Sequence, residues 1–265
     1  MKKHPLISII TPTYNRSKYH ERLYECFTSQ TYPQKELLIL DDSQEPSSFF
    51  TNLKDPRVHY THSPKRLTLG EKRNYLLEKA QGEIIAHFDD DDFYAPKYLH
   101  FMTNNLDKTH SLVKLASWFI YSEQLKSFFY WDTTHLSPTH FIVQGNRPLN
   151  AVKGPEESNH DFILNTLWGY GFSYVYHRSL YPDIAFDAQD TFDEDIHFIQ
   201  KIKKTGLLCR AILDTEGLAL HVIHGSNSSR IFPQYILPPF IIEKFFPNLL
   251  KIQCNLSKNN SPIQV

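Results

Sequence analysis

The chain has 265 residues, of which 41% are hydrophobic and 22% are charged, and this composition excludes collagen-like, disordered and coiled-coil proteins. Its 28 Lys and Arg residues nearly balance 29 Asp and Glu residues, for a formal net charge of −1. The chain therefore lacks the excess of positive charge that would indicate binding to nucleic acid. The three cysteines are widely spaced and no run of about 18 apolar residues occurs, which argues against a disulfide framework, a thiolate zinc site and a membrane-spanning helix.

The first hundred residues predict strands that alternate with helices. Four apolar runs are typical of short buried strands: residues 6–10, 36–40, 58–60 and 83–88. The first run ends at a Thr-Pro-Thr segment that indicates a turn. Apolar residues recur at helical spacing between Tyr19 and Gln30, and Thr68 with Glu71 forms a capping-box pattern that begins another helix. This alternation predicts an α/β fold with a mainly parallel sheet covered on both faces, whose ligands collect where the strands end.

The pattern changes after Pro96. We expect a helix to about Leu106, and then hairpin or mixed-sheet strands around residues 118–121 and 128–131. A second capping-box pattern, Thr191 to Glu194, predicts a helix that ends at Gly206. Strands at 207–213 and 218–222 follow. No linker rich in Gly or Ser divides the chain, so we predict one compact unit in two halves, residues 1–106 and 107–230, with a C-terminal extension at residues 231–265.

Four consecutive aspartates, Asp89 to Asp92, directly follow the fourth predicted strand. Adjacent carboxylates repel each other by about 1 to 4 kcal/mol at a separation of 4 Å, so a positive charge must offset them. Mg²⁺ and Mn²⁺ bind carboxylate oxygens together with phosphate oxygens. The run therefore predicts a divalent-metal site, and a solvated acidic turn is the alternative. His224 and His221 could add an imidazole ligand; we favour His224, because His221 lies within a strand-like run.

Five segments of the first half have an order and spacing that are informative when taken together: Pro5–Arg16, Ser29–Pro33, Glu36–Asp42, Gly70–Asn74 and Ala80–Asp92. Together they resemble the family 2 glycosyltransferases of the GT-A fold, and the resemblance returns at residues 171–206 and 224–227. It implies a Rossmann-like three-layer α/β/α sandwich, in which residues 1–106 bind the nucleotide-sugar and residues 107–230 bind the acceptor and catalyse transfer. It also implies an inverting, metal-dependent glycosyltransferase that moves a sugar from a UDP-sugar to an acceptor hydroxyl.

The resemblance assigns roles to single residues on the nucleotide side. Pro12, Tyr14 and Arg16, in the first loop, would surround the base and the diphosphate. Tyr14 offers an aromatic face to uracil, and Arg16 offers a permanent cation to phosphate. Asp42 would accept from the imide N–H of uracil, and Arg73 would approach the nucleotide. An ordinary turn and a plain exposed helical arginine are the corresponding alternatives.

The family's Asp-x-Asp signature maps to Asp89 and Asp91, which would bind Mn²⁺ or Mg²⁺ together with His224, while Asp90 would bind the ribose. Because four aspartates stand in a row, the register of this assignment is open by one residue.

On the acceptor side, the resemblance implies that Asp195 is the general base that deprotonates the attacking hydroxyl. Asp193 and Glu194 are the alternatives. Glu194 has a structural task as the capping partner of Thr191, which favours Asp195 as the base and leaves Glu194 near the acceptor. Trp168 offers an aromatic face for a sugar ring, although a core aromatic cluster would use it equally well.

The predicted partners are a UDP-sugar donor and a glycan, lipid-linked or protein acceptor, in glycan, polysaccharide or lipopolysaccharide synthesis. The absence of a secretory signal and of a membrane span predicts a cytoplasmic protein that reaches lipid-linked acceptors from the inner face of a membrane. Residues 240–246 would dock there, or pack on the core instead. Two rival functions are a non-catalytic sugar-nucleotide-binding scaffold and a nucleotidyltransferase. The second would have a glycine-rich phosphate loop after the first strand, and Thr11–Tyr14 contains no glycine.

Overall fold

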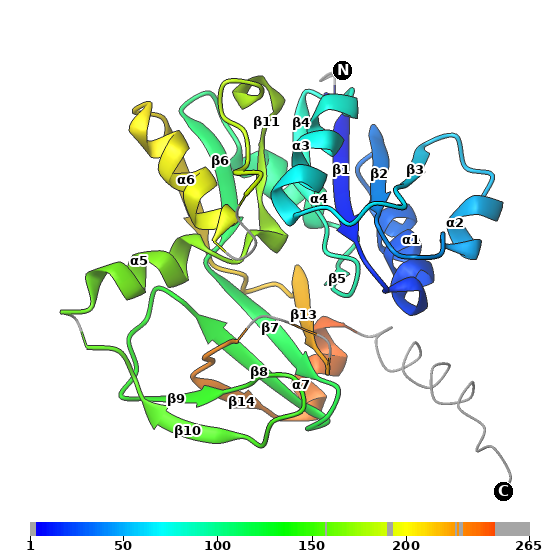
Figure 1. Ribbon diagram of the computed structural model, residues 1–265. Helices are drawn as coiled ribbons and strands as arrows, with labels where there is room; N and C mark the ends of the chain where they lie inside the picture. The colour runs from blue at the N-terminus through cyan, green and yellow to red at the C-terminus, as the bar shows by residue number, and fades with distance from the viewer. Residues whose placement is uncertain (1–3, 157, 190–192, 226, 228–229, 247–265) are drawn as a thin grey trace, which may run out of the picture.

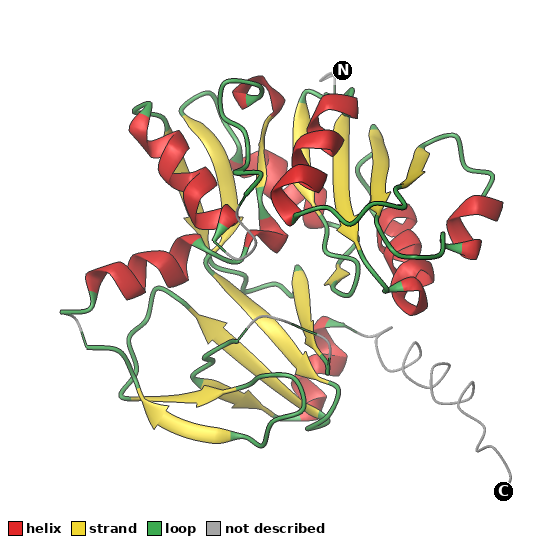
Figure 2. Ribbon diagram, in the orientation of Figure 1, coloured by secondary structure: helices red, strands yellow, loops and turns green. Residues whose placement is uncertain are grey.

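The structure is a computed structural model, and it describes residues 4–156, 158–189, 193–225, 227 and 230–246. These residues form a large mixed sheet with helices on both faces, a second sheet beside it and a separate pair of strands (Figures 1 and 2). Within the same ranges, no helix combines the length and the apolar character that crossing a membrane requires.

The main sheet contains seven of the described strands, with β1 inside it. In spatial order the strands are β12 (Leu208–Ile212), β6 (His110–Leu115), β11 (Val175–His177), β4 (Ile84–His87), β1 (Ile7–Thr13), β2 (Lys35–Asp41) and β3 (Val58–His62). Neighbours run parallel, except that β11 is antiparallel to both β4 and β6. The predicted mainly parallel sheet is confirmed, and β6 and β11 are strands that the sequence analysis missed.

Helices cover both faces of this sheet because successive side chains of a strand point to opposite faces. From β1, Ile7 and Ile9 belong to one core cluster with α1 (His20–Ser29) and α4 (Tyr98–Asn105). Ile10 belongs to another cluster, with α3 (Leu69–Lys79) and α6 (Glu194–Lys204). The three-layer α/β/α sandwich is therefore confirmed. The other described helices are α2 (Ser48–Asn52), α5 (His160–Trp168), α7 (Pro239–Phe245) and the short 3-10 helices Ser17–Tyr19, Gly171–Ser173 and Arg178–Leu180.

The second sheet comes mainly from the later half of the chain (Figure 1). In spatial order its strands are β14 (Tyr235–Leu237), β8 (Ser127–Asp132), β7 (Ser117–Ser122), β13 (Ala219–Ile223) and β5 (Phe93–Tyr94); the separate pair is β9 (Thr139–Ile142) with β10 (Asn150–Lys153). Strands β7 and β8 are antiparallel neighbours, as the aromatic segments predict. Their Trp118 and Trp131 pack edge to face, with ring centroids 5.2 Å apart.

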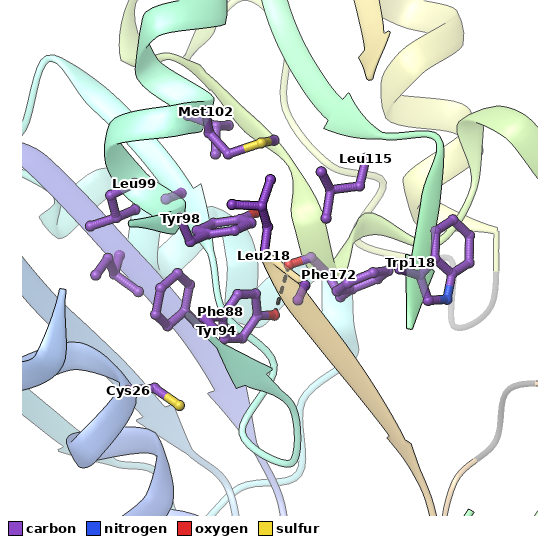
Figure 3. Packing of buried hydrophobic residues seen from close by; sticks show 14 of the residues in the cluster. Cys26, Phe88, Tyr94, Tyr98, Leu99, Met102, Leu115, Trp118, Phe172 and Leu218 are labelled. Atoms are coloured by element: carbon purple, nitrogen blue, oxygen red, sulfur yellow. Dashed lines mark hydrogen bonds between the residues drawn. The ribbon is translucent and has the colours of Figure 1, made fainter. Parts of the chain in front are cut away.

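A layer of buried aromatic rings supports the end of β4 (Figure 3). Phe88 and Tyr94 stack with ring centroids 3.8 Å apart. The Tyr94 hydroxyl donates to the carbonyl of Phe172 at 2.8 Å and accepts from the backbone N–H of Asp89 at 2.9 Å. This hydroxyl therefore ties the start of the aspartate run to the 3-10 helix Gly171–Ser173.

Strand β1 differs from its prediction, because it continues through the Thr-Pro-Thr segment that indicates a turn. Pairing of β1 with β4 ends at Ile10, whereas pairing with β2 continues to Thr13. Pro12 lies beyond the part of β1 that pairs with β4. Its missing N–H therefore removes no hydrogen bond between these two strands.

The capping predictions are confirmed at α3 and only in part at α6. The capping box of Thr68 and Glu71 is present at α3. The second capping pattern is wrong about the start of its helix: α6 begins at Glu194 with Asp193 as its N-cap, so Glu194 is the first helical residue and not the third. Thr191 lies outside the described residues. The end of α6, just before Thr205 and Gly206, is as predicted.

The tail packs on the second sheet. Ile242 and Phe246 are buried against β7, β8 and β13, whereas Phe240 is exposed. Packing on the core, the alternative to membrane docking, is thus observed for two of these apolar side chains.

Candidate active site

A cleft of about 850 Å³ lies at the carboxyl ends of the central strands and faces the start of α6. Most of the predicted site residues line it: Pro12, Tyr14, Arg16, Arg73, Asp89, Asp90, Asp91, Glu194 and Asp195. Asp42, Trp168 and His224 are absent from its wall. Long-range folding thus brings the first loop, the aspartate run and α6 to one place.

The side chains of the four aspartates point in different directions and make different contacts. Asp92 turns away from the cleft, and its carboxylate accepts from Nδ1 of His221 at 2.8 Å and from the N–H of Val222 at 2.9 Å. These bonds attach the end of the run to β13. Asp90 accepts from the hydroxyl of Thr13. The carboxylates of Asp89, Asp90 and Asp91 remain on the cleft wall.

Asp91 is the centre of a polar cluster at the wall. Its carboxylate pairs with the guanidinium of Arg16 and lies 2.9 Å from Nε2 of His224. The same Nε2 lies 3.1 Å from Nη1 of Arg16. Burial, with the charge of Arg16, lowers the pKa of His224 to about 4, so this ring is neutral at pH 7.

Three of these carboxylates form a group with the chemistry of a divalent-metal site. One oxygen from each of Asp89, Asp91 and Asp92 lies within 4.8 Å of the others. Burial and the nearby charge of Asp92 raise the pKa of Asp89 to about 7, and the opposing charges of Arg73 and His221 are smaller effects. Hard carboxylate oxygens suit Mg²⁺ or Mn²⁺.

His221, which the sequence ranks below His224 as a ligand, lies next to this group because its imidazole contacts Asp92. Its Nδ1 faces the Asp92 carboxylate, which can only accept, so Nδ1 carries the hydrogen. Burial lowers the pKa of His221, but Asp92 and Asp89 outweigh burial and the pKa is raised. His221 lines the cleft, and among the described atoms its buried Nε2 has no hydrogen-bond partner. A histidine oriented by a carboxylate in this way is the usual form of a metal ligand.

The predicted uracil site is occupied by protein side chains. The guanidinium of Arg66 lies 3.4 Å from the ring centroid of Tyr14. Asp42 accepts from Arg66 at 2.6 Å, from the N–H of Leu67 at 2.8 Å and from Lys72 at 2.8 Å. Burial alone would raise the pKa of Asp42, but these donors outweigh burial and lower it. Arg66, missed by the sequence analysis, therefore covers both residues that were predicted to bind the base.

Arg73 contacts carboxylates of α6 rather than projecting freely into the cleft. Its buried guanidinium pairs with Glu194 at 2.8 Å and with the carboxylate of Asp195. The other Asp195 oxygen accepts from the N–H of Gly171 at 2.7 Å. A Cβ atom at position 171 would lie 2.2 Å from Oδ1 of Asp195, so any larger residue there would displace this carboxylate. Asp195 is therefore held at the cleft by two donors from different elements.

A buried lysine donates hydrogen bonds to the loop before Gly171. Lys114, in β6, donates to the carbonyls of Leu167 at 2.6 Å and Gly169 at 2.5 Å. Burial lowers the pKa of Lys114 to about 7. The sequence analysis missed this residue, although a single lysine inside the apolar run of β6 is a visible signal.

Trp168 lies on the far side of this loop. Nζ of Lys203 lies 4.2 Å from its ring centroid, and the ring packs against the second core cluster. Among the aromatic residues of this segment, Tyr170 and Phe172 line the cleft instead. The alternative that Trp168 belongs to a core aromatic cluster agrees with this position.

Comparison with known sequences matches more than half of the chain to one family. Residues 8–167 match the family model described as glycosyl transferase family 2. The putative colanic acid biosynthesis glycosyl transferase WcaA of Escherichia coli is 37% identical over 103 residues, which cover 37% of this chain and 37% of that protein. The putative teichuronic acid biosynthesis glycosyltransferase TuaG of Bacillus subtilis is 32% identical over 93 residues, which cover 33% of this chain and 36% of that protein. The chain thus spans less than half the length of these relatives.

Solved structures are similar over most of the chain. Staphylococcus aureus TarS 1-349 in complex with UDP-GlcNAc has a TM-score of 0.61 at 17% identity, covering 85% of this chain and 62% of that chain. The mannosyltransferase PcManGT from Pyrobaculum calidifontis, in complex with GDP-Man and Mn²⁺, has a TM-score of 0.56 at 18% identity, covering 83% of this chain and 57% of that chain. At these identities the likeness concerns the fold, and it confirms the predicted GT-A type.

Proposed function

The chain belongs to glycosyl transferase family 2, and from this membership we propose that it transfers a sugar from a UDP-sugar to an acceptor hydroxyl, with inversion at the anomeric carbon. Relatives named for colanic acid and teichuronic acid biosynthesis support a role in making a polysaccharide or another glycan. One observation carries the proposal: the aspartate run and the oriented carboxylate of Asp195 line the same cleft. In this scheme residues 1–106 bind the donor and residues 107–230 bind the acceptor.

The uridine would bind on Tyr14 once Arg66 has moved. The Arg66 side chain is 56% exposed, so its flexible end can leave the ring at little energetic cost. Asp42 then gains a free acceptor for the imide N–H of uracil, while Lys72 and Leu67 continue to hold its carboxylate. This acceptor favours uridine over a base that presents no matching donor.

The diphosphate would bind between the first loop and the aspartate run. A bound Mn²⁺ or Mg²⁺ would neutralise the charge that grows on the leaving diphosphate. Asp89, Asp91 and Nε2 of His221 are the ligands that we propose for it, and His224, the ligand favoured by the sequence, would orient Asp91. Arg16, already beside Asp91, would turn its permanent positive charge toward phosphate oxygens, and Asp90 would bind the ribose.

Asp195 would act as the general base. The N–H of Gly171 and the guanidinium of Arg73 fix the orientation of its carboxylate, and a lone pair left by these donors would receive the proton of the acceptor hydroxyl. Attack from the face opposite to the diphosphate would invert the anomeric centre. Glu194 also pairs with Arg73. We therefore propose that Glu194 positions Arg73, and through it Asp195, at the acceptor side.

The experiment that tests the function is a screen of UDP-sugars and GDP-mannose with Mn²⁺, with and without saccharide acceptors. Release of UDP, increased by an acceptor, is the expected result. Tight binding of UDP without any release from any UDP-sugar would indicate a non-catalytic scaffold instead. Release from GDP-mannose alone would contradict the uridine assignment.

A further inference from the structure

A second cavity, of about 270 Å³, lies beside the cleft and shares three residues with it: Phe162, Thr166 and Phe232. Its other walls come from the end of β8, the pair of strands β9 and β10, and the start of α5. None of the residues assigned to the donor, the metal or the base lines it. The cavity is therefore a separate space that borders the acceptor side of the cleft.

His140 gives this cavity a specific chemical requirement. The side chain is 5% exposed, and its Nδ1 lies 2.6 Å from the carbonyl oxygen of Phe232. A carbonyl can only accept, so Nδ1 carries the hydrogen, and Nε2 of the neutral ring is an acceptor. This Nε2 is buried and has no hydrogen-bond partner among the described atoms. A buried acceptor left without a donor costs about 1–3 kcal/mol. Because His140 lines the cavity, a ligand hydroxyl that reaches Nε2 after a small movement of the ring would remove that cost.

Aromatic rings form the rest of the recognition surface. Phe232 stands between Trp131 and Phe162, with ring centroids 6.1 Å from each. Phe162 is 44% exposed although it is a large apolar side chain. A pyranose ring presents C–H groups on its faces and hydroxyls at its rim, so it matches apolar walls that surround one hydrogen-bond acceptor.

The size of the cavity sets the size of the occupant. Pockets for drug-sized ligands enclose about 300–1,000 Å³, and 270 Å³ lies just below this range. The space therefore suits a single sugar ring rather than a longer chain. The shared wall of Phe162, Thr166 and Phe232 keeps that ring next to whatever occupies the cleft.

Resting on the proposed function, we propose that this cavity is an acceptor subsite that binds one sugar unit of a saccharide, adjacent to the unit whose hydroxyl is glycosylated. The acceptor is then a saccharide of at least two rings. One ring lies in the cleft near Asp195, and the next lies against Phe232 and donates a hydroxyl hydrogen to Nε2 of His140. A monosaccharide fills only one of the two spaces and binds more weakly.

The test fills the cavity from two opposite walls. Val152, in β10, and Ile163, in α5, line the cavity but not the cleft. Val152→Trp and Ile163→Trp would each occupy the space for the sugar. Their exposed neighbours give matched controls, Ala151→Trp and Leu164→Trp, because these residues line neither space. Thermal melting and binding of UDP with Mn²⁺ check that each variant is folded and that the donor site is intact.

Labelled wild-type protein and the four variants are applied, with UDP and Mn²⁺, to an array of bacterial mono- and oligosaccharides and to vesicles that contain a polyprenyl phosphate. Wild type and both controls should bind oligosaccharides at least about tenfold more tightly than monosaccharides, a difference of about 1.4 kcal/mol. Both cavity-filling variants should lose that advantage and keep UDP binding.

Three results would overturn the subsite. They are equal binding of mono- and oligosaccharides by the wild type, unchanged oligosaccharide binding by both filled variants, and binding of the polyprenyl vesicles alone that both filled variants lose. Binding of UDP with no saccharide bound at all would also reject the subsite and leave the donor site standing. Failure to bind any nucleotide would instead reject the proposed function.

Discussion

Replacement of Gly171 by alanine tests, with the smallest possible change, how Asp195, the proposed general base, is held. A Cβ atom at this position would lie 2.2 Å from Oδ1 and 2.4 Å from Cγ of Asp195, far inside van der Waals contact. The Asp195 carboxylate must therefore move, and it loses the 2.7 Å bond from the N–H of Gly171. A hydrogen bond to a charged group is worth about 1.5–3 kcal/mol, and a general base contributes about 10²- to 10⁴-fold to the rate. We expect Gly171→Ala to lower kcat by about 10²-fold or more.

The assay is the rate of UDP release with a saccharide acceptor, together with calorimetry of UDP binding in Mn²⁺. UDP affinity should stay within about twofold of wild type, because Gly171 contacts the base and not the proposed nucleotide site. The double variant Gly171→Ala with Asp195→Asn should be no slower than Asp195→Asn alone, since groups that act as a unit are not additive. Near wild-type turnover by Gly171→Ala, or an additive further loss in the double variant, would refute the assignment of Asp195.

Asp195→Asn alone should keep UDP affinity and lose about 10²- to 10⁴-fold in kcat, measured by acceptor-dependent UDP release; full activity would exclude it as the base. Asp91→Ala should abolish the increase in UDP affinity that Mn²⁺ produces, and calorimetry that shows the same increase as in wild type would contradict its role as a ligand. Burial lowers the pKa of Lys114 to about 7 in the folded protein, whereas its pKa in the unfolded chain is about 10.4. Between these two pH values the unfolded chain binds one more proton at this residue than the folded protein. The free energy of unfolding therefore rises with pH in this range. Urea unfolding at pH 7.5 and 9 should show wild type gaining up to about 1.4 kcal/mol per pH unit relative to Lys114→Met, and an equal pH slope in the two proteins would show that Lys114 is charged in the fold.

The first hundred residues of the fold could be predicted from the sequence because their signals are local. Strands such as β2 and β4 are apolar runs that end in aspartates, and the capping box at Thr68 marks the start of α3. Strand β11 has only three residues, Val175–His177, which is too short for a recognisable alternation. Its place between β4 and β6 depends on pairing partners far away in the chain.

Most of the predicted site residues line one cleft, but their contacts with each other could not be predicted. Arg73 and Asp195 are 122 residues apart in the sequence, and no local pattern indicates that they pair. The choice between the two histidines depends on which ring faces the cleft. His221 is fixed by the register of β13 on β7 and by Asp92, and neither is visible in a sequence pattern. Arg66 was missed for the same reason, because its contact with Tyr14 joins two loops.

We propose that one cleft holds a metal-bound UDP against the aspartate run, within reach of Asp195. A crystal structure of the protein with UDP and Mn²⁺, with the metal located by anomalous scattering, tests it most directly. We expect a manganese peak bonded to Asp91 and Asp89 and to Nε2 of His221, with the diphosphate beside Arg16 and the uracil on Tyr14. A manganese peak elsewhere, or UDP bound away from Tyr14 and the aspartate run, would contradict it.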